Sequence, residues 1–233
     1  MIGRPRVHHA VTGSTNERAK ELAATGAPHG TLVTADEQSA GRGRQGRTWV
    51  APRRSAVLMS LVLREYDALL PLRAAVAARE GLACGANMMH EPSIKWPNDL
   101  WVDGRKLGGI LVEGRPQEGW AVLGMGLNVW TESEDFPPDL REIATSVVMV
   151  EGGAPDVEVV LGELLPYLDI WLRAKPAEVL EAWRAWDALK GRAISWDGGS
   201  GTAAGIDDSG ALLVDTTDGR VALQAGEVHL RLE

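Results

Sequence analysis

The sequence predicts an α+β protein, with helices packed on a mixed central β-sheet and a small β-barrel at the C-terminus. Three features of the chain carry this prediction. Residues 56–63 form a continuous apolar run, which is typical of a central strand covered on both faces. Residues 69–87 are Ala-rich with helical spacing. Beyond Gly191 the chain changes to short strand-like runs separated by Gly- and Asp-rich turns, which is typical of a small barrel.

The first elements are predicted from capping residues. Ser14 and Glu17 fit a capping box, so a helix begins near residue 14, and Gly26 ends it. Residues 31–35 then form a short buried strand. The Ala-rich helix starts at Pro71, because proline suits the first turn of a helix.

A hairpin and two glycine-containing strands follow. Asp103 and Gly104 separate two apolar runs, which is the strongest short sequence signal for a hairpin. Lys106 lies just beyond this turn on the returning strand, either as a solvated edge residue or pointing at a ligand. Residues 120–129 form another strand. Glycines within both strands indicate the close approach of a ligand or of another backbone.

Three helices are predicted before the barrel. They cover residues 138–150, 157–175 and 176–189, and Pro166 is expected to kink or break the second one. Tryptophans at helical spacing in the third helix, such as Trp183, are expected in the core.

Five short strands make the C-terminal barrel, which their spacing predicts to be of the SH3 type. They cover residues 192–196, 202–206, 211–214, 220–223 and 227–230. The change in pattern divides the chain into a larger domain over residues 1–189 and a barrel domain over residues 190–233.

The charge of the chain is distributed unevenly. The 233 residues carry a net charge of −8. Residues 1–54 nevertheless contain nine Lys and Arg against four Asp and Glu, whereas the remainder contains 15 against 28. An acidic protein with one basic segment fits a small anionic ligand better than a long polyanion, which calls for a broad basic face.

The number of cysteines and the hydropathy of the chain indicate the cellular environment in which the protein is expected. A single cysteine, Cys84, excludes an internal disulfide, and its apolar neighbours predict a buried small residue. No apolar run reaches the roughly 18 residues of a membrane-spanning helix, and the N-terminus lacks the apolar core of a signal peptide. We therefore expect a cytoplasmic protein without membrane attachment.

The basic charge is concentrated in residues 38–49, which we call the Gly/Arg loop. Its glycines let a ligand approach the backbone, and its arginines suit phosphate or carboxylate. A plain surface loop and a nucleic-acid contact are the alternatives. The run also fits G-x-G-x-x-G, but that dinucleotide fingerprint needs a strand directly before it and a helix directly after. Residues 36–40 intervene and Pro52 follows, so the sequence favours a phosphate-handling loop.

Several motifs in a fixed order give the chain a family resemblance. They are residues 14–16, 41–49, 95–99, 106–113, 124–128, 144–146 and 226–228. With these motifs in register over nearly its whole length, the chain resembles the biotin–protein ligases (biotin–[acetyl-CoA-carboxylase] ligases). The resemblance implies a class II synthetase-like catalytic domain with bound biotin and ATP, followed by an SH3-like domain.

The resemblance also implies a reaction in two steps. The carboxylate of biotin attacks the α-phosphorus of ATP, which gives biotinyl-5′-AMP and pyrophosphate, with Mg²⁺ accompanying ATP. A lysine of a biotin carboxyl carrier domain then attacks the mixed anhydride and releases AMP. Fixed positive charge offsets the repulsion between the two anions, and a closing loop shields the intermediate from water.

Residue roles follow from the resemblance. The ureido ring of biotin would lie among four polar side chains, those of Ser14, Thr15, Asn16 and Gln38. The Gly/Arg loop would close over biotin and the phosphoanhydride and reach the nucleotide phosphates with its glycines and arginines, namely Gly41, Arg42, Gly43, Arg44 and Arg47.

Further roles fall on the strands and the hairpin. Lys106 would contact the carboxyl oxygen of biotin and the α-phosphate, and Gly109 and Gly124 would leave room for the biotin tail. Trp49 would stack on adenine, and Asn128 would hydrogen-bond it.

Three more residues border the implied site, namely Lys95, Asn98 and Asp99. Asp99 is assigned either to Mg²⁺ or to the orientation of the acceptor lysine. The catalytic set is therefore Lys106, Arg44 and Asp99, and no protein-only metal site is assigned.

One departure from the family concerns DNA. Some biotin–protein ligases carry an N-terminal winged helix–turn–helix and act as repressors, but only 13 residues precede Ser14 here. We therefore expect no DNA binding. A homodimer formed side by side through the sheet and a monomer are both compatible with the sequence.

Two alternative functions stay open. A lipoate–protein ligase or lipoyl transferase would share the fold and the adenylate, although the Gly/Arg loop and the 95–99 motif argue against it. A nucleic-acid-binding regulator would use the basic loop and the barrel. The barrel argues against this, because its cations (Arg192, Arg220, His229, Arg231) face at least five acidic residues and few aromatic ones.

Overall fold

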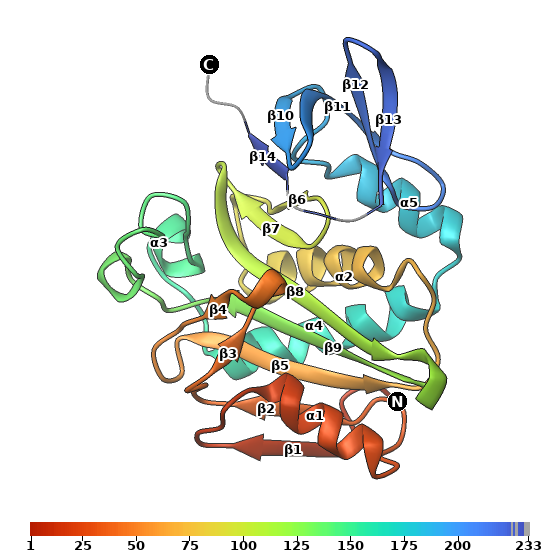
Figure 1. Ribbon diagram of the computed structural model, residues 1–233. Helices are drawn as coiled ribbons and strands as arrows, with labels where there is room; N and C mark the ends of the chain where they lie inside the picture. Colours follow the sequence, from red (N-terminus) through yellow and green to blue (C-terminus); the bar gives the residue numbers. More distant parts are fainter. Residues whose placement is uncertain (225, 227, 231–233) are drawn as a thin grey trace.

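A seven-stranded sheet forms the centre of the protein in a computed structural model that describes residues 1–224, 226 and 228–230. The strand order is β1-β2-β5-β9-β8-β7-β6 (Figure 1). The strands span Arg6–His9 (β1), Leu32–Ala35 (β2), Ala56–Leu63 (β5), Ser93–Lys95 (β6), Asp99–Val102 (β7), Arg105–Arg115 (β8) and Trp120–Asn128 (β9). Strand β1 pairs with β2 in parallel and the other neighbours pair antiparallel, which confirms the mixed sheet.

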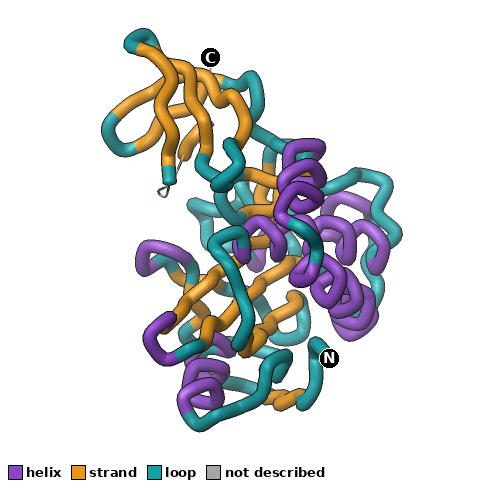
Figure 2. The backbone as a smooth tube through the Cα atoms, turned by 90° about the vertical axis from the view of Figure 1, so that its right-hand side faces the viewer, coloured by secondary structure: helices purple, strands orange, loops and turns teal. Residues whose placement is uncertain are grey.

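Helices cover both faces of this sheet (Figures 1 and 2). Helix α1 packs on β2, β5 and β9, while α2 packs on β6, β7 and β8 and is backed by α4 and α5. The helices span Thr15–Ala24 (α1), Leu70–Gly85 (α2), Val147–Glu151 (α3), Val157–Arg173 (α4) and Pro176–Ala185 (α5). All eight residues of β5 and all nine of β9 are buried, as expected for central strands covered on both faces.

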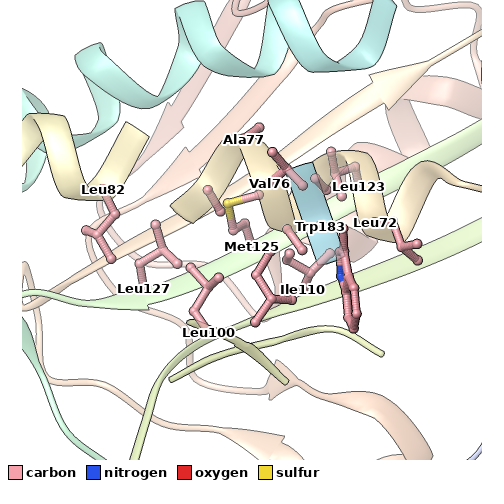
Figure 3. Close-up of a cluster of buried hydrophobic side chains, with 14 of the residues drawn as sticks. Leu72, Val76, Ala77, Leu82, Leu100, Ile110, Leu123, Met125, Leu127 and Trp183 are labelled. Carbon is pink, nitrogen blue, oxygen red and sulfur yellow. The ribbon is translucent and has the colours of Figure 1, made fainter. Parts of the chain in front are cut away.

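The main hydrophobic core lies between the sheet and α2. Leu123, Met125 and Leu127 of β9 point to the same side and meet Val76 and Leu82 of α2 (Figure 3). Trp183 of α5 is fully buried in the same cluster, as its helical spacing predicts. Because side chains alternate across a strand, this arrangement leaves the even-numbered residues of β9 on the other face.

Two helix predictions were wrong. Residues 138–150 do not form one helix: α3 starts only at Val147, where Ser146 caps it by accepting a hydrogen bond from the Met149 amide at 3.3 Å. The preceding backbone instead pairs with β8, through Lys106 N to Ile143 O at 2.7 Å and Thr145 N to Lys106 O at 2.8 Å. Tertiary pairing therefore overrides the local helical pattern.

Helix α4 continues through Pro166 without a break. Proline removes one hydrogen bond, to the residue four positions earlier, but burial of Leu161, Leu164 and Leu168 against α2 holds the helix on both sides. Of the kink or break predicted at Pro166, the break was therefore wrong.

The N-terminal cap of α1 also differs from the prediction. Ser14 occupies the cap position, but its side chain makes no capping hydrogen bond within the described structure. Glu17 does not reach back to it, because its carboxylate binds Lys20 at 2.6 Å and Arg42. Gly26 follows the end of the helix with φ of +92°, as predicted.

The C-terminal segment forms the SH3-like domain, with a five-stranded sheet in the order β13-β12-β11-β10-β14. The strands span Ala193–Trp196 (β10), Gly199–Ile206 (β11), Leu212–Thr216 (β12), Gly219–Leu223 (β13) and Val228–Leu230 (β14). All the pairs are antiparallel. Two residues used in the sequence analysis, Glu227 and Arg231, lie outside the described residues.

Two surface features complete the description. Over the residues that the structure describes, no helix is long and apolar enough to cross a membrane. Cys84 is exposed rather than buried, because it lies on the outer side of the last turn of α2, 4.0 Å from Glu163 Oε2.

Candidate active site

A large cavity lies over the face of the central sheet opposite α2. Its volume is about 870 Å³. The Gly/Arg loop, with the short β3 (Gly41–Arg42) and β4 (Thr48–Trp49), lies in front of this face (Figure 1). Nearly all the predicted site residues line the cavity, namely Ser14, Thr15, Asn16, Gln38, Arg42, Gly43, Arg44, Arg47, Trp49, Lys95, Asn98, Asp99, Lys106, Gly109, Gly124 and Asn128. The structure thus brings together predicted site residues that are up to 114 positions apart in the sequence, from Ser14 to Asn128, and Ala144, Gly226 and Val228 of the later motifs line the same cavity.

Gly41 is the predicted site residue that is not among the described residues lining the cavity. It pairs with Trp49 across β3 and β4, and a Cβ at Gly41 would collide with the Trp49 carbonyl oxygen. Its glycine is required for the close approach of the two ends of the loop.

Two glycines on the cavity face of β9 make room for other side chains. Gly124 lies under the amide of Asn16, and a Cβ there would collide with it. Gly126 lies under the indole of Trp49, where a Cβ would be 2.5 Å from the ring. Asn128 follows on the same face, so the three positions form one row along the strand.

A chain of buried hydrogen bonds fixes one end of the cavity. Gln38 Oε1 accepts from the amide of Thr15 at 2.7 Å and lies 3.0 Å from its hydroxyl. Ser60 Oγ on β5 lies 2.8 Å from the Thr15 hydroxyl and 2.6 Å from Asn16 Oδ1. All but Gln38 are less than 5% exposed. These groups form a neutral polar floor, suited to a ligand with both donors and acceptors.

The middle of the cavity holds an exposed cation beside a carboxylate. Lys106 Nζ lies 2.7 Å from Asp99 Oδ1. A Cβ at Gly109 would lie 3.2 Å from the same nitrogen, so this glycine leaves the lysine its place. Arg44 reaches across from the Gly/Arg loop and donates to Asn98 Oδ1 at 3.0 Å. The loop and the hairpin therefore meet directly at the cationic part of the site.

Arg42 is held away from these groups by two acids. It binds Glu17, and its Nη2 lies 3.6 Å from Glu113 Oε1. Lys20 bridges the same carboxylates, at 2.6 Å from Glu17 and 3.1 Å from Glu113. The hydrogen bond from Lys20, together with that from Arg42, lowers the pKa of Glu17 below its usual value. Glu17 thus remains charged, and the two acids together hold the loop against α1 and β8.

Two buried polar atoms near the opposite end lack a partner among the described residues. Asn128 Nδ2 donates to the Thr145 carbonyl at 3.0 Å, but Asn128 Oδ1 accepts no hydrogen bond. Trp49 Nε1 is also without a partner. Because buried polar atoms are usually hydrogen-bonded, an orphan acceptor beside an indole fits a flat ligand that carries an N–H group.

Asp36 anchors the base of the Gly/Arg loop. Its carbonyl accepts from the Arg54 amide at 2.8 Å, and its carboxylate binds Arg54 Nε at 3.0 Å and Arg53 Nη2 at 3.4 Å. Burial raises the pKa of Asp36, but these arginines outweigh it and hold the pKa below its usual value. The strand before the loop and the segment after it are thereby joined.

Several site residues were not identified from the sequence. Ser60 could have been found, because it is a lone hydroxyl within an apolar run. Trp101 lines the cavity and stacks under Lys95 at 4.9 Å, and no sequence signal marked it. Val228 belongs to the 226–228 motif, which was given no role in the site, and it lines the cavity together with His229 of the C-terminal sheet.

Comparison with known proteins identifies the protein family to which the chain belongs. A model of the biotin/lipoate A/B protein ligase family matches residues 9–129, and a model of the biotin protein ligase C-terminal domain matches residues 200–231. The chain therefore belongs to the biotin/lipoate A/B protein ligase family.

Within this family, its relatives are biotin–protein ligases. It is 37% identical to the biotin–[acetyl-CoA-carboxylase] ligase of Paracoccus denitrificans, over 94% of this chain and 98% of that protein. The corresponding ligase of Mycobacterium tuberculosis is 36% identical, over 95% and 88%. The bifunctional ligase/repressor BirA of Bacillus subtilis is 36% identical, over 99% and 75%.

A solved structure supports the same assignment. The biotin protein ligase of Aquifex aeolicus, in complex with biotin and ATP, superimposes with a TM-score of 0.86 at 26% identity. The match covers 99% of this chain and 100% of that one. The resemblance drawn from the sequence motifs is thus confirmed.

Proposed function

We propose that this protein uses ATP to attach biotin to a specific lysine of a biotin carboxyl carrier domain, through biotinyl-5′-AMP. One observation of geometry carries the proposal. Along β9, Gly124 lies under the polar floor at Asn16, Gly126 pairs with Gly109 beside Lys106, and Asn128 presents its orphan acceptor. At about 3.4 Å per residue, this row spans roughly 14 Å. A polar ring on the floor, a phosphoanhydride beside Lys106 and an adenine beside the Trp49 indole and Asn128 can follow this row in that order.

The first half-reaction is assigned to the cationic middle of the cavity. An oxygen of the biotin carboxylate bonds to the α-phosphorus of ATP, and the bond from that phosphorus to the pyrophosphate oxygen breaks. Lys106 offsets the repulsion between the carboxylate and the phosphate and stabilises the charge that develops on the α-phosphate. Asp99, at 2.7 Å, keeps the ammonium in place.

The second half-reaction consumes the adenylate. The neutral amine of the acceptor lysine attacks the acyl carbon, an amide forms, and the bond to the AMP oxygen breaks. AMP leaves with its phosphate group, and the attacking amine loses a proton. We assign Asp99 to the orientation of the incoming lysine.

Nucleotide binding is assigned to the loop and to the end of β9. The orphan acceptor of Asn128 supports a hydrogen bond from the exocyclic amine of adenine, and the indole of Trp49 lies next to it for stacking. Arg42, Arg44 and Arg47 bind phosphate oxygens when the loop closes. Gly43 lets that backbone approach, and Lys95 and Asn98 border the phosphates.

Magnesium is proposed to enter as MgATP. Within the described part of the chain, no three His, Cys, Asp or Glu side chains gather to hold a metal ion. Mg²⁺ at nucleotide sites is commonly held by one or two carboxylates together with phosphates. Asp139 on the cavity wall is the carboxylate of the described lining that is not already assigned to Lys106 or to the incoming lysine.

We also propose that the functional division of the chain falls at residues 189 and 190. Residues 1–189 hold the floor, the cationic centre and the adenine site. We assign residues 190–233 to the barrel domain, whose β14 lines one side of the cavity.

Pyrophosphate release tests the proposed function directly. The protein is incubated with MgATP and either biotin or lipoate, and pyrophosphate is measured with and without a biotin carboxyl carrier domain. We expect release with biotin, a carrier-bound biotin amide when the domain is present, and no release above background with lipoate. Pyrophosphate release with lipoate but not with biotin would contradict this proposal and would indicate a lipoate–protein ligase.

A further inference from the structure

Glu113 is the one charged residue of the 106–113 motif that has no role in the reaction described above. It lies on β8, and its side chain is 23% exposed. One carboxylate oxygen, Oε2, accepts a hydrogen bond from Asn16 Nδ2 at 2.8 Å. The other, Oε1, binds Lys20 at 3.1 Å and faces Arg42 at 3.6 Å. A single carboxylate thus joins the Gly/Arg loop to the floor of the cavity.

The contacts of Asn16 allow only one orientation of its amide. A carboxylate can only accept hydrogen bonds, so the NH₂ group must face Glu113. The Leu111 carbonyl lies on the same side, 3.5 Å from Nδ2. The amide oxygen therefore faces the Ser60 hydroxyl at 2.6 Å. Since an amide oxygen has two lone pairs and the hydroxyl uses one, Asn16 offers the cavity an acceptor and no donor.

We propose that Glu113 is a positioning residue for biotin: it holds the amide of Asn16 with the oxygen available to a ureido N–H group. The inference rests on the proposed function. It makes Glu113 a determinant of the polarity of the floor, although Glu113 is not among the described residues that line the cavity. A reversed amide would place an NH₂ group against the ureido N–H, and two donors facing each other in a buried site are unfavourable.

The neighbouring cations make an isosteric substitution informative. In Glu113→Gln the side chain keeps its size but carries one oxygen and one NH₂ group. Lys20 and Arg42 attract the oxygen to their side, which leaves the NH₂ group facing Asn16. The amide of Asn16 then reverses, and the floor changes from acceptor to donor.

The test compares steady-state constants of the full-length protein and two variants. For Glu113→Gln we expect the KM for biotin to rise roughly 10- to 100-fold, as for a lost hydrogen bond to a charged group. The KM for ATP should not change, and kcat at saturating biotin should fall much less. Glu17→Gln is the matched control, because the Glu17 carboxylate binds the same two cations, whereas the Asn16 amide donates its hydrogen bond to Glu113 and not to Glu17 in the described structure. An equal rise in both variants would show an effect of charge alone and would overturn the inference.

Biotin analogues give a second readout, and its first comparison uses only the wild-type protein. The wild-type protein should bind at least one of the two ureido N-methylbiotins tenfold or more weakly than biotin, since methylation removes the hydrogen that Asn16 accepts. In Glu113→Gln this difference should shrink. If the wild type binds both analogues as well as biotin, the inference fails. If it does not bind biotin at all, the proposed function itself fails.

Discussion

At the scale of single residues, the site combines a lysine paired with a carboxylate, an acceptor without a hydrogen-bond partner and several glycines. Lys106 lines the cavity and is held by Asp99 across the hairpin, 2.7 Å away. Asn128 supplies the acceptor. Glycine at positions 109, 124 and 126 leaves the volume that Lys106, Asn16 and Trp49 occupy.

Replacement of Lys106 by alanine should abolish adenylate formation while the fold is kept. Loss of one fixed stabilising group of this kind lowers the rate by about 100- to 1000-fold. The fold should persist, because a half-exposed ion pair contributes only about 0–1 kcal/mol to stability. The measurement is biotin-dependent pyrophosphate release, with the melting temperature checked in parallel.

The control for this change is Lys190→Ala, which removes an exposed lysine far along the chain from the hairpin. It should release pyrophosphate at the wild-type rate. Biotinyl-AMP formation by Lys106→Ala at the wild-type rate would show that the catalytic assignment is wrong.

At the scale of elements, the Gly/Arg loop is tied at both ends and in the middle. Asp36 joins its base to Arg53 and Arg54, Arg42 binds the acids on α1 and β8, and Arg44 reaches Asn98. A loop with such exchangeable ion pairs can leave α1 for an anionic ligand at small net cost, because each exposed pair is weak. This is the arrangement expected of a lid.

Removal of the Arg44 side chain should affect the intermediate more than the chemistry. Arg44→Ala loses the contact that spans from the loop to the hairpin, so biotinyl-AMP should escape or hydrolyse faster. In the absence of the acceptor, the protein should therefore release more pyrophosphate for each molecule of biotinyl-AMP that stays bound to it. Rapid gel filtration after a single turnover measures that retention.

Arg173→Ala is a suitable comparison, since it removes an arginine that is 65% exposed on α4. It should retain the adenylate as the wild type does. Equal retention by Arg44→Ala and the wild type would argue against a closing role of the loop.

Most elements could be predicted because their signals are local. The Asp103-Gly104 turn has φ of +50° and +78°, as its hairpin signature requires, and the apolar run of β5 is buried throughout. The non-helical backbone of residues 138–146 was not predictable in this way, because pairing of Ile143 and Thr145 with Lys106 decides the backbone there. Pro166 misled for a related reason: packing against α2 outweighs one lost hydrogen bond.

Most residues of the candidate site could be predicted from sequence motifs, but the hydrogen bonds that connect them could not. The motifs name Asn16, Lys106 and Asn128, and all three line one cavity. The links between them depend on distances across the sheet. Ser60 and Glu113, which hold Asn16 from either side, come from strands that are adjacent to β9 only after folding.

At the scale of the whole molecule, both parts of the chain contribute to one cavity. The central sheet supplies the row along β9, the Gly/Arg loop covers it, and β14 of the C-terminal sheet closes one side with Val228 and His229. Substrates that fill this cavity together should therefore stabilise the molecule more than either one alone, since a ligand that binds only the folded state adds RT ln(1 + [L]/Kd) to stability.

Thermal unfolding with biotin alone, MgATP alone and both together tests the central claim most directly. Biotin and MgATP together should raise the melting temperature by clearly more than the sum of the two single shifts, because tightly held biotinyl-AMP replaces two weaker ligands. A 1000-fold excess over Kd corresponds to about 4 kcal/mol, or on the order of 10 °C for a protein of this size. Biotin with an ATP analogue that cannot be cleaved at the α-phosphate should give only the sum. A shift with both substrates that is no larger than the sum would contradict the account.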